Sequence, residues 1–185
     1  MSSAKFKDFV IVTTNVNKLS EINEILGTKH KLSTIDVPEI QSLNLEEVIR
    51  AKAKAAYSII KKPVLVEDVS FEIKALNGLP GTFVKFFLQT LGTEGTVKLI
   101  GKKKSETKVT NATAIYDGNT MKIFKSSISG TLSKKDKGSH GFGFDKVFIP
   151  RGYSITYAQM PPALKNKISH RAKALKKLRN YLVGQ

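Results

Sequence analysis

Apolar and polar positions along the first third of the chain follow a strand–helix pattern. The apolar run 9–12 predicts a buried strand, and the polar residues 13–18 predict a turn after it. Apolar residues then recur at helical spacing as far as Leu26, and Gly27 is the expected end of this helix. The segment therefore predicts a strand, a polar loop and a helix in immediate succession.

A second helix and strand follow. Asn44, with Glu47 three residues later, resembles a capping box and predicts a helix with an apolar stripe between 48 and 59. The apolar run 64–66 predicts a second buried strand, with the two acids of 67–68 at its carboxyl end. The order of the elements is that of an α/β protein.

The second half of the chain has a different character. Its predicted elements are two helices, a β-hairpin, a strand and one last helix; they cover 82–91, 93–100, 109–116 with 121–124, 147–149 and 163–182. The hairpin signal is strong because Asp117-Gly118-Asn119 separates its two strands. With no repeat and no linker in the sequence, we expect a mixed α/β fold in one domain over 1–185.

Composition excludes several classes of protein. Of the 185 residues, 41% are hydrophobic, which is adequate for a packed core and excludes a disordered chain. No apolar run approaches the ~20 residues of a membrane span, and the first residues lack the apolar region of a signal peptide. Cysteine is absent, which excludes disulfides, thiolate catalysis and zinc held by cysteine. A reducing setting is compatible with this, and we expect a cytoplasmic protein without membrane partners.

The charge is strongly positive: 31 Lys and Arg against 15 Asp and Glu leave a net charge of +16. Such a chain attracts polyanions, a class that includes nucleotides, nucleic acid and anionic lipid. The bias is strongest after Pro150, where no acid occurs. A solvated basic surface explains the charge equally well, so weak nucleic-acid binding is one expectation among others.

Two places could bind a phosphorylated ligand. The loop 13–18 opens a helix and therefore presents free N–H groups, to which Lys18 adds a charge, although on local sequence an ordinary loop is favoured. The adjacent carboxylates Glu67 and Asp68, together with Glu39, suit a cation such as Mg²⁺ that shares its site with phosphate. The alternative for these acids is simple capping of the next turn.

Two more segments carry candidate groups for a base. The segment 142–145 places two phenylalanines and an acid next to a glycine-rich run, where rings could stack on a nucleobase. Lys165, His170 and Arg171 are donors grouped near the start of the last helix. In both cases the structural alternative stays open: rings that anchor a loop to the core, and the polar face of an amphipathic helix.

The order of these motifs carries more information than any one of them. The segments concerned are 13–19, 66–68, 78–81, 141–145, 157–160 and the run Lys165-Asn166 to Ser169-His170-Arg171. In sequence and spacing they closely resemble the inosine triphosphate pyrophosphatase family over about 10–182.

The resemblance implies an elongated, two-lobed mixed-sheet α/β fold and a homodimer. It also implies hydrolysis of non-standard purine nucleoside triphosphates (ITP, dITP and XTP) to the monophosphate and pyrophosphate, with Mg²⁺ as cofactor and Mn²⁺ as its substitute. The triphosphate is then assigned to Thr13, Thr14, Asn15, Val16, Asn17, Lys18 and Lys52. The metal is assigned to Glu39 and Asp68, and catalysis to Asp68 as base with Glu67 and Lys18. The purine is assigned to Phe142, Gly143, Phe144, Asp145, Lys165, His170 and Arg171, and Val69 is a further substrate-binding position.

Three residues depart from the family pattern. Thr14 stands where glycine is usual, and Val69 stands where a hydroxyl residue is usual. Phe144 stands where the family usually has Trp or Tyr, whose rings carry a polar group that phenylalanine lacks. None of the three changes removes a charged group, so we expect an active enzyme. Two alternatives remain open: a Maf-like nucleotide pyrophosphatase with another base preference, and a basic nucleic-acid-binding protein on the same scaffold. Ser169-His170-Arg171 argues against the first.

Overall fold

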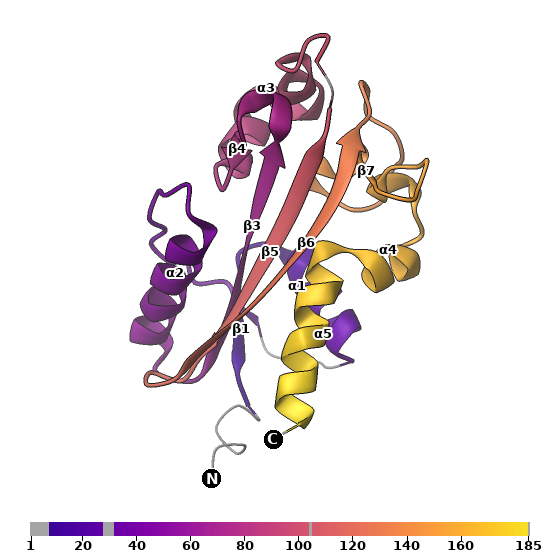
Figure 1. The fold of residues 1–185 in the computed structure, drawn as a ribbon. Helices are drawn as coiled ribbons and strands as arrows, with labels where there is room; N and C mark the ends of the chain where they lie inside the picture. The colour runs from indigo at the N-terminus through magenta and orange to yellow at the C-terminus, as the bar shows by residue number, and fades with distance from the viewer. Residues whose placement is uncertain (1–7, 28–31, 104, 185) are drawn as a thin grey trace. The chain divides into compact units, whose positions relative to one another are not determined.

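The computed structural model describes residues 8–27, 32–103 and 105–184 (Figure 1). The chain forms two compact units, each assembled from separate stretches of sequence. The first unit comprises 1–68, 111–126 and 171–185, and the second comprises 69–110 and 127–170. In the described ranges, no helix is long and apolar enough to cross a membrane.

The first unit is built on a mixed sheet. Its helices are α1 (Val16–Leu26), α2 (Leu45–Ile60) and α5 (His170–Val183, apart from its first residue). Its strands are β1 (Val10–Val12), β2 (Leu32–Ser33) and parts of β3 (Val64–Ile73), β5 (Thr107–Tyr116) and β6 (Met121–Leu132). The strands follow the order β2-β1-β3-β5-β6, and β1 is parallel to both β2 and β3.

Helices cover both faces of this sheet. Val64 and Val66 of β3 pack with Ile49 of α2 in one cluster, and Leu65 packs with Leu175 of α5 in another. The separation follows from the strand's alternation, since successive side chains point to opposite faces. Figure 1 shows α2 and α5 on opposite sides of the strands. The burial of β3 on both sides is why its first three residues, Val64 to Val66, form a continuous apolar run.

The second unit contains the other elements. They are β4 (Pro80–Gly81), α3 (Val84–Lys98), β7 (Phe148–Pro150), α4 (Pro162–Ile168), three short 3₁₀ turns (Lys74–Leu76, Gly143–Lys146 and Tyr157–Gln159) and the remaining parts of β3, β5 and β6. β4 pairs antiparallel with β3, and β7 pairs antiparallel with β6. Phe71, Phe148 and Tyr157 lie at the centre of its core.

The predicted mixed α/β fold is confirmed, and so are several local predictions. α1 ends at Gly27, which has a left-handed φ of 68°. The two helices predicted before and after Gly92 form the two halves of α3. Gly92 itself has non-helical backbone angles, so α3 is kinked between them. β5 and β6 are joined at the predicted hairpin turn, where Asp117 N–H donates to the Thr120 carbonyl at 3.3 Å.

The prediction that a strand ends at Glu67 and Asp68 is wrong. β3 continues to Ile73, so the two acids lie in the middle of a ten-residue strand. The reason is that Val69, Phe71 and Ile73 are apolar at alternate positions and bury their side chains in the core of the second unit.

Two other boundaries also differ from prediction. The prediction of one last helix is wrong, because Ser169 has an extended backbone (φ −65°, ψ 161°) and separates α4 from α5. β6 extends to Leu132 rather than 124, through a half-exposed, serine-rich stretch without a strong apolar pattern. Asn44 caps α2 as predicted by accepting from the Glu46 N–H, but the Glu47 carboxylate contacts the Ser42 hydroxyl and the Asn44 side chain instead of the Asn44 backbone.

Candidate active site

The loop between β1 and α1 is organised by its own side chains. The Thr13 hydroxyl accepts from the Asn15 N–H at 3.1 Å, and Asn15 Oδ1 accepts from the N–H groups of Asn17 and Lys18 at 3.0 and 3.2 Å. These bonds provide acceptors for two of the free N–H groups in the first turn of the helix, as in an ordinary capped helix. The loop therefore needs no ligand to hold its shape.

Other N–H groups of the same loop remain available. Among the described residues, the N–H groups of Thr14 and Val16 have no acceptor. Thr14 precedes α1 and Val16 is its first residue, and the dipole at this end of a helix favours an anion. The side chains of Thr14, Val16 and Asn17 are exposed. The loop can thus offer two backbone donors to a phosphate.

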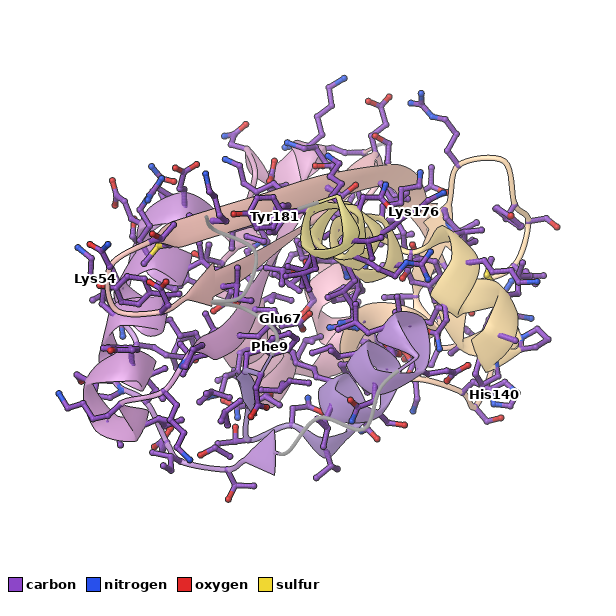
Figure 2. All side chains as sticks on the ribbon, turned by 90° about the horizontal axis from the view of Figure 1, so that it is seen from below. Phe9, Lys54, Glu67, His140, Lys176 and Tyr181 are labelled. Carbon is purple, nitrogen blue, oxygen red and sulfur yellow. The ribbon has the colours of Figure 1, made fainter. Side chains whose placement is uncertain are left out.

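Glu67 lies at the centre of a buried polar network in the first unit (Figure 2). Arg171 binds it through two nitrogens, with Nε 2.9 Å from Oε2 and Nη2 2.6 Å from Oε1. Asn111 Nδ2 donates to Oε2 at 2.9 Å, and Lys18 Nζ lies 3.4 Å from Oε1. Burial raises the pKa of Glu67, but the charges of Arg171 and Lys18 and the hydrogen bonds outweigh it and hold that pKa well below its usual range.

Arg171 is held from two sides. Its Nη1 donates to Glu21, while Nε and Nη2 bind Glu67. Burial lowers the pKa of Arg171, and the two carboxylates more than compensate, so the guanidinium stays charged. Arg171 in turn fixes the carboxylate that Lys18 approaches. Glu67 and Arg171 therefore act as one buried support for the Lys18 ammonium.

Sequence reasoning missed three members of this network: Glu21, Asn111 and Thr113. The Thr113 hydroxyl donates to Asn111 Oδ1 at 2.8 Å, which orients the amide so that its nitrogen faces Glu67. One signal was present in the sequence. Asparagine is depleted in strands, so Asn111 inside a strand of otherwise apolar and threonine residues indicates a buried polar contact.

We expect Asn111→Leu to lower the free energy of unfolding by about 1–3 kcal/mol, because Glu67 loses a donor and the Thr113 hydroxyl loses its acceptor. Urea denaturation measures the change. Thr110→Val is the control, since Thr110 is the preceding residue of the strand and its hydroxyl bonds to the Ser127 hydroxyl near the surface. Equal stability of the two variants would show that the Asn111 amide is not important for the network.

A second charged group in the first unit contains Lys52, Glu39 and Asp68. Lys52 Nζ lies 2.5 Å from Glu39 Oε1 and 3.5 Å from Asp68 Oδ2, so one ammonium links the two acids. Burial lowers the pKa of Lys52, but Asp68 and Glu39 outweigh this and raise it above its usual value. The side chains of Asp68 and Glu39 keep 19% and 43% of their exposure, which leaves both accessible to a ligand.

This acid pair fits a magnesium ion of the kind that is shared with a phosphorylated substrate. In the described part of the chain, no three His, Asp or Glu side chains form a ready cage for a metal. Mg²⁺ does not require such a cage, since it usually keeps several waters and binds one or two carboxylates together with substrate phosphates. Two carboxylates on one ammonium leave a net charge of −1, which attracts a cation.

The predicted base-binding residues form a cluster in the second unit. Lys165 Nζ lies 2.5 Å from Asp145 Oδ2, and both side chains are 4% exposed. The same ammonium lies 4.9 Å from the centre of the Phe142 ring and 5.7 Å from that of Tyr157. Asp145 also accepts from the Phe142 N–H at 2.8 Å, which fixes the loop. A buried cation beside a partly exposed ring is therefore built into this unit.

The other members of the cluster are mainly structural. Phe144 stacks on Phe71, with ring centres 4.4 Å apart, and lies 5.8 Å from His170. Its ring anchors the loop to the core, the alternative that the sequence had left open. Val69 is also buried in this core, which explains how an apolar residue is tolerated there. Gly143 has a positive φ of 60°, which favours glycine.

The predicted residues thus lie in two clusters, one in each unit. Arg171, which the resemblance grouped with the base pocket, contacts Glu67 and Glu21 in the first unit. Asp68 and Val69 are consecutive in the sequence, as are His170 and Arg171. In each pair one residue belongs to the first cluster and the next residue in the chain belongs to the second.

Comparison with known proteins shows the family of the chain. The model of the Ham1 family matches residues 9–181. The chain belongs to the Ham1 family. A HAM1 protein from Coxiella burnetii has a similar structure, with a TM-score of 0.82 and 25% identity over 96% of this chain and 99% of that chain.

Two curated Ham1-like relatives carry functional names. An inosine triphosphate pyrophosphatase of Yarrowia lipolytica is 42% identical over 182 residues, which cover 94% of each chain. A dITP/XTP pyrophosphatase of Hyperthermus butylicus is 36% identical over 94% of this chain and 93% of its own. The similarity therefore extends over nearly the full length of both relatives.

The resemblance to the inosine triphosphate pyrophosphatase family had raised a question about Thr14, which stands where glycine is usual. In the structure, Thr14 is not among the non-glycine residues with positive φ. Its side chain is exposed and its N–H is available. The backbone of this loop consequently does not require glycine, and the threonine introduces no strain.

Proposed function

We propose that this protein hydrolyses the bond between the α- and β-phosphates of ITP, dITP and XTP, giving the monophosphate and pyrophosphate. The observation that carries the proposal is the group of Lys52, Glu39 and Asp68, in the same unit as Lys18 and the loop that opens α1. Phosphate binding needs cations and N–H donors, and attack by water needs a carboxylate; this unit supplies all three.

Each group has a separate task in the first unit. Lys18 and Lys52, with the N–H groups of Thr14 and Val16, bind the triphosphate and stabilise the charge that pyrophosphate carries as it leaves. Asp68 orients the attacking water and accepts its proton. Glu67 is saturated by Arg171, Asn111 and Lys18, so its task is to hold Lys18 in place.

Magnesium is the cofactor that we propose, with Mn²⁺ as its substitute. Glu39 and Asp68 would hold it, because they are the accessible carboxylates beside Lys52. When bound, the metal offsets negative charge that develops on the phosphate oxygens. Lys52 keeps the two carboxylates together in the protein by itself, so the acid pair does not depend on the metal for its arrangement.

The purine is assigned to the cluster of the second unit. Lys165 and His170 are donors, and hypoxanthine and xanthine carry a 6-oxo acceptor where adenine carries a 6-amino donor. An adenine base would leave a buried donor unpaired, at a cost of about 1–3 kcal/mol for each one. The partly exposed Phe142 ring provides a surface for stacking.

A pyrophosphate-release assay over ITP, XTP, dITP, GTP and ATP, with and without Mg²⁺, tests the proposal. We expect release from ITP, dITP and XTP only with the metal, and kcat/KM for ATP lower by at least about tenfold, in line with one unpaired donor. Absence of pyrophosphate from all three expected substrates would refute the activity. A preference for modified pyrimidines would favour the Maf-like alternative instead.

The homodimer that the resemblance implies is part of the same proposal. The structure describes one chain, and sedimentation of the purified protein tests the prediction directly. A sedimenting species of about twice 20.4 kDa is expected, and a monomer at all concentrations would contradict it.

A further inference from the structure

The exposed side of α5 carries a dense positive charge that the proposed reaction does not use. Lys173, Lys176 and Lys177 are exposed and are spaced so that they share one helical face. No acid occurs after Asp145 in the sequence, so α5 has no acid of its own to neutralise them. The opposite side of the helix is buried through Leu175 and Leu178.

The start of β6 extends this charged face within the first unit. Lys122 is exposed on β6, and the Lys177 ammonium donates to the backbone carbonyl of Lys125 at 2.7 Å. Lys122 Nζ lies 5.8 Å from the centre of the Tyr181 ring of α5. These two contacts place the helix and the strand side by side. Figure 2 labels Tyr181 and Lys176 on α5. We call Lys122, Lys173, Lys176 and Lys177 the α5–β6 basic face.

Ion pairs within the protein do not account for this face. The Lys125 side chain is not part of the face, because its ammonium pairs at 2.7 Å with Glu46 of α2, on the opposite side of the sheet. In the part of the chain that the structure describes, Lys173 and Lys176 form no ion pair with any residue. Like charges at helical spacing destabilise a helix slightly. Their grouping therefore suits an external anion better than it suits the fold.

The form of the face favours nucleic acid over a lipid membrane. An interfacial helix inserts exposed apolar side chains into the membrane, but the large apolar residues of α5 are packed against α1 and the sheet, with Val183 at its end as the exposed exception. Lysines are point charges that bind phosphates without reading bases. Successive phosphates of a nucleic-acid strand are evenly spaced charges, and several lysines on one face can contact them together.

We propose that the α5–β6 basic face binds the sugar–phosphate backbone of nucleic acid without sequence preference. The interaction is weak, with Kd in the range of about 10⁻⁴–10⁻⁶ M at physiological salt, as is usual for non-specific binding. It is independent of nucleotide hydrolysis, because Lys173 and Lys176 take no part in the proposed active site. It also accounts for part of the +16 charge that the reaction leaves unexplained.

Fluorescence anisotropy with labelled single-stranded DNA, duplex DNA and single-stranded RNA tests the proposal. The test variant is Lys173→Glu/Lys176→Glu, whose side chains are exposed and form no ion pair among the described residues. We expect Kd to rise at least about tenfold and the slope of log Kd against log salt to fall by about 2, one for each lost phosphate contact. The three probes decide which form of nucleic acid the face prefers.

The control is Lys134→Glu/Lys135→Glu, an exposed lysine pair in the second unit that changes the net charge by the same amount. It is expected to bind like wild type. Equal weakening in both variants would overturn the proposal, since net charge alone would then explain binding. So would no binding to any probe, or binding only to vesicles containing phosphatidylserine. Pyrophosphate release, measured in parallel, is expected to be unchanged in both variants, so failure of the enzymatic proposal would be recognised separately.

Discussion

Replacement of Asp68 by asparagine is expected to lower kcat/KM for ITP by about 10²–10⁴-fold, the usual range for loss of a general base. The amide has nearly the shape of the carboxylate but cannot accept the proton of the attacking water. It also removes one of the two negative charges beside Lys52. Pyrophosphate release measures the activity, and thermal unfolding verifies that the fold is kept.

The matched control for this variant is Glu72→Gln on the same strand. Glu72 is also a half-buried acid of β3, paired with Lys108 at 3.2 Å and hydrogen-bonded to Ser70, but it belongs to the second unit and is not one of the candidate site residues. We expect its activity to stay close to that of wild type. If Asp68→Asn keeps full activity, Asp68 is not the base and the mechanism must be revised.

The elements that could be predicted from the sequence are those with local signals. The strand before residue 13, the helix that ends at Gly27 and the turn around Gly118 each depend on residues close together in the chain. The length of β3 was missed because its apolar residues change from a continuous run to alternation after Asp68. That change accompanies the passage of the strand from one compact unit to the other.

The residues of the candidate site also differ in how far local sequence could predict them. Taken alone, the loop 13–18 favoured an ordinary turn, and the bonds made by Asn15 are indeed those of a capped helix. The residues themselves had grouped Glu39 with Glu67 and Asp68, whereas only the resemblance indicated Lys52, as a ligand of the triphosphate. Asn111 and Arg171 could not be linked to Glu67 by spacing, since they lie 44 and 104 residues away in the sequence. Only the fold brings such groups together.

The break between α4 and α5 has the same physical origin. The segment 163–182 has apolar residues at helical spacing throughout, and this pattern predicts one helix. The apolar residues Leu164 and Ile168 pack in the second unit, while Leu175 and Leu178 pack in the first. The apolar periodicity does not show that its two halves join different cores, and the extended backbone of Ser169 has no sequence signal of its own.

Arg171→Met is expected to lower the free energy of unfolding by about 3–5 kcal/mol, the usual cost of leaving one member of a buried ion pair without its partner. Glu67 would stay buried with only Asn111 and the more distant Lys18 to stabilise its charge. Urea denaturation at neutral pH measures the loss. The double variant Glu67→Gln/Arg171→Met removes the stranded charge as well and is expected to recover part of the stability. If the double variant is as unstable as the sum of its single variants, the two residues are not energetically coupled.

The same ion pair predicts how stability depends on pH. The pKa of Glu67 in the folded protein is well below 4.5, its ordinary value, whereas in the unfolded chain it returns to about that value. Between the two values the unfolded chain binds more protons, so the stability that Glu67 provides is fully present above about pH 5 and is lost as the pH falls through that range. We expect Glu67→Gln to show a shallower loss of stability between pH 5 and pH 3 than wild type, measured by urea denaturation at each pH. Glu72→Gln, which changes an acid outside the network, is expected to keep the wild-type slope. Parallel curves for Glu67→Gln and wild type would mean that Glu67 is not held as an anion in the folded protein.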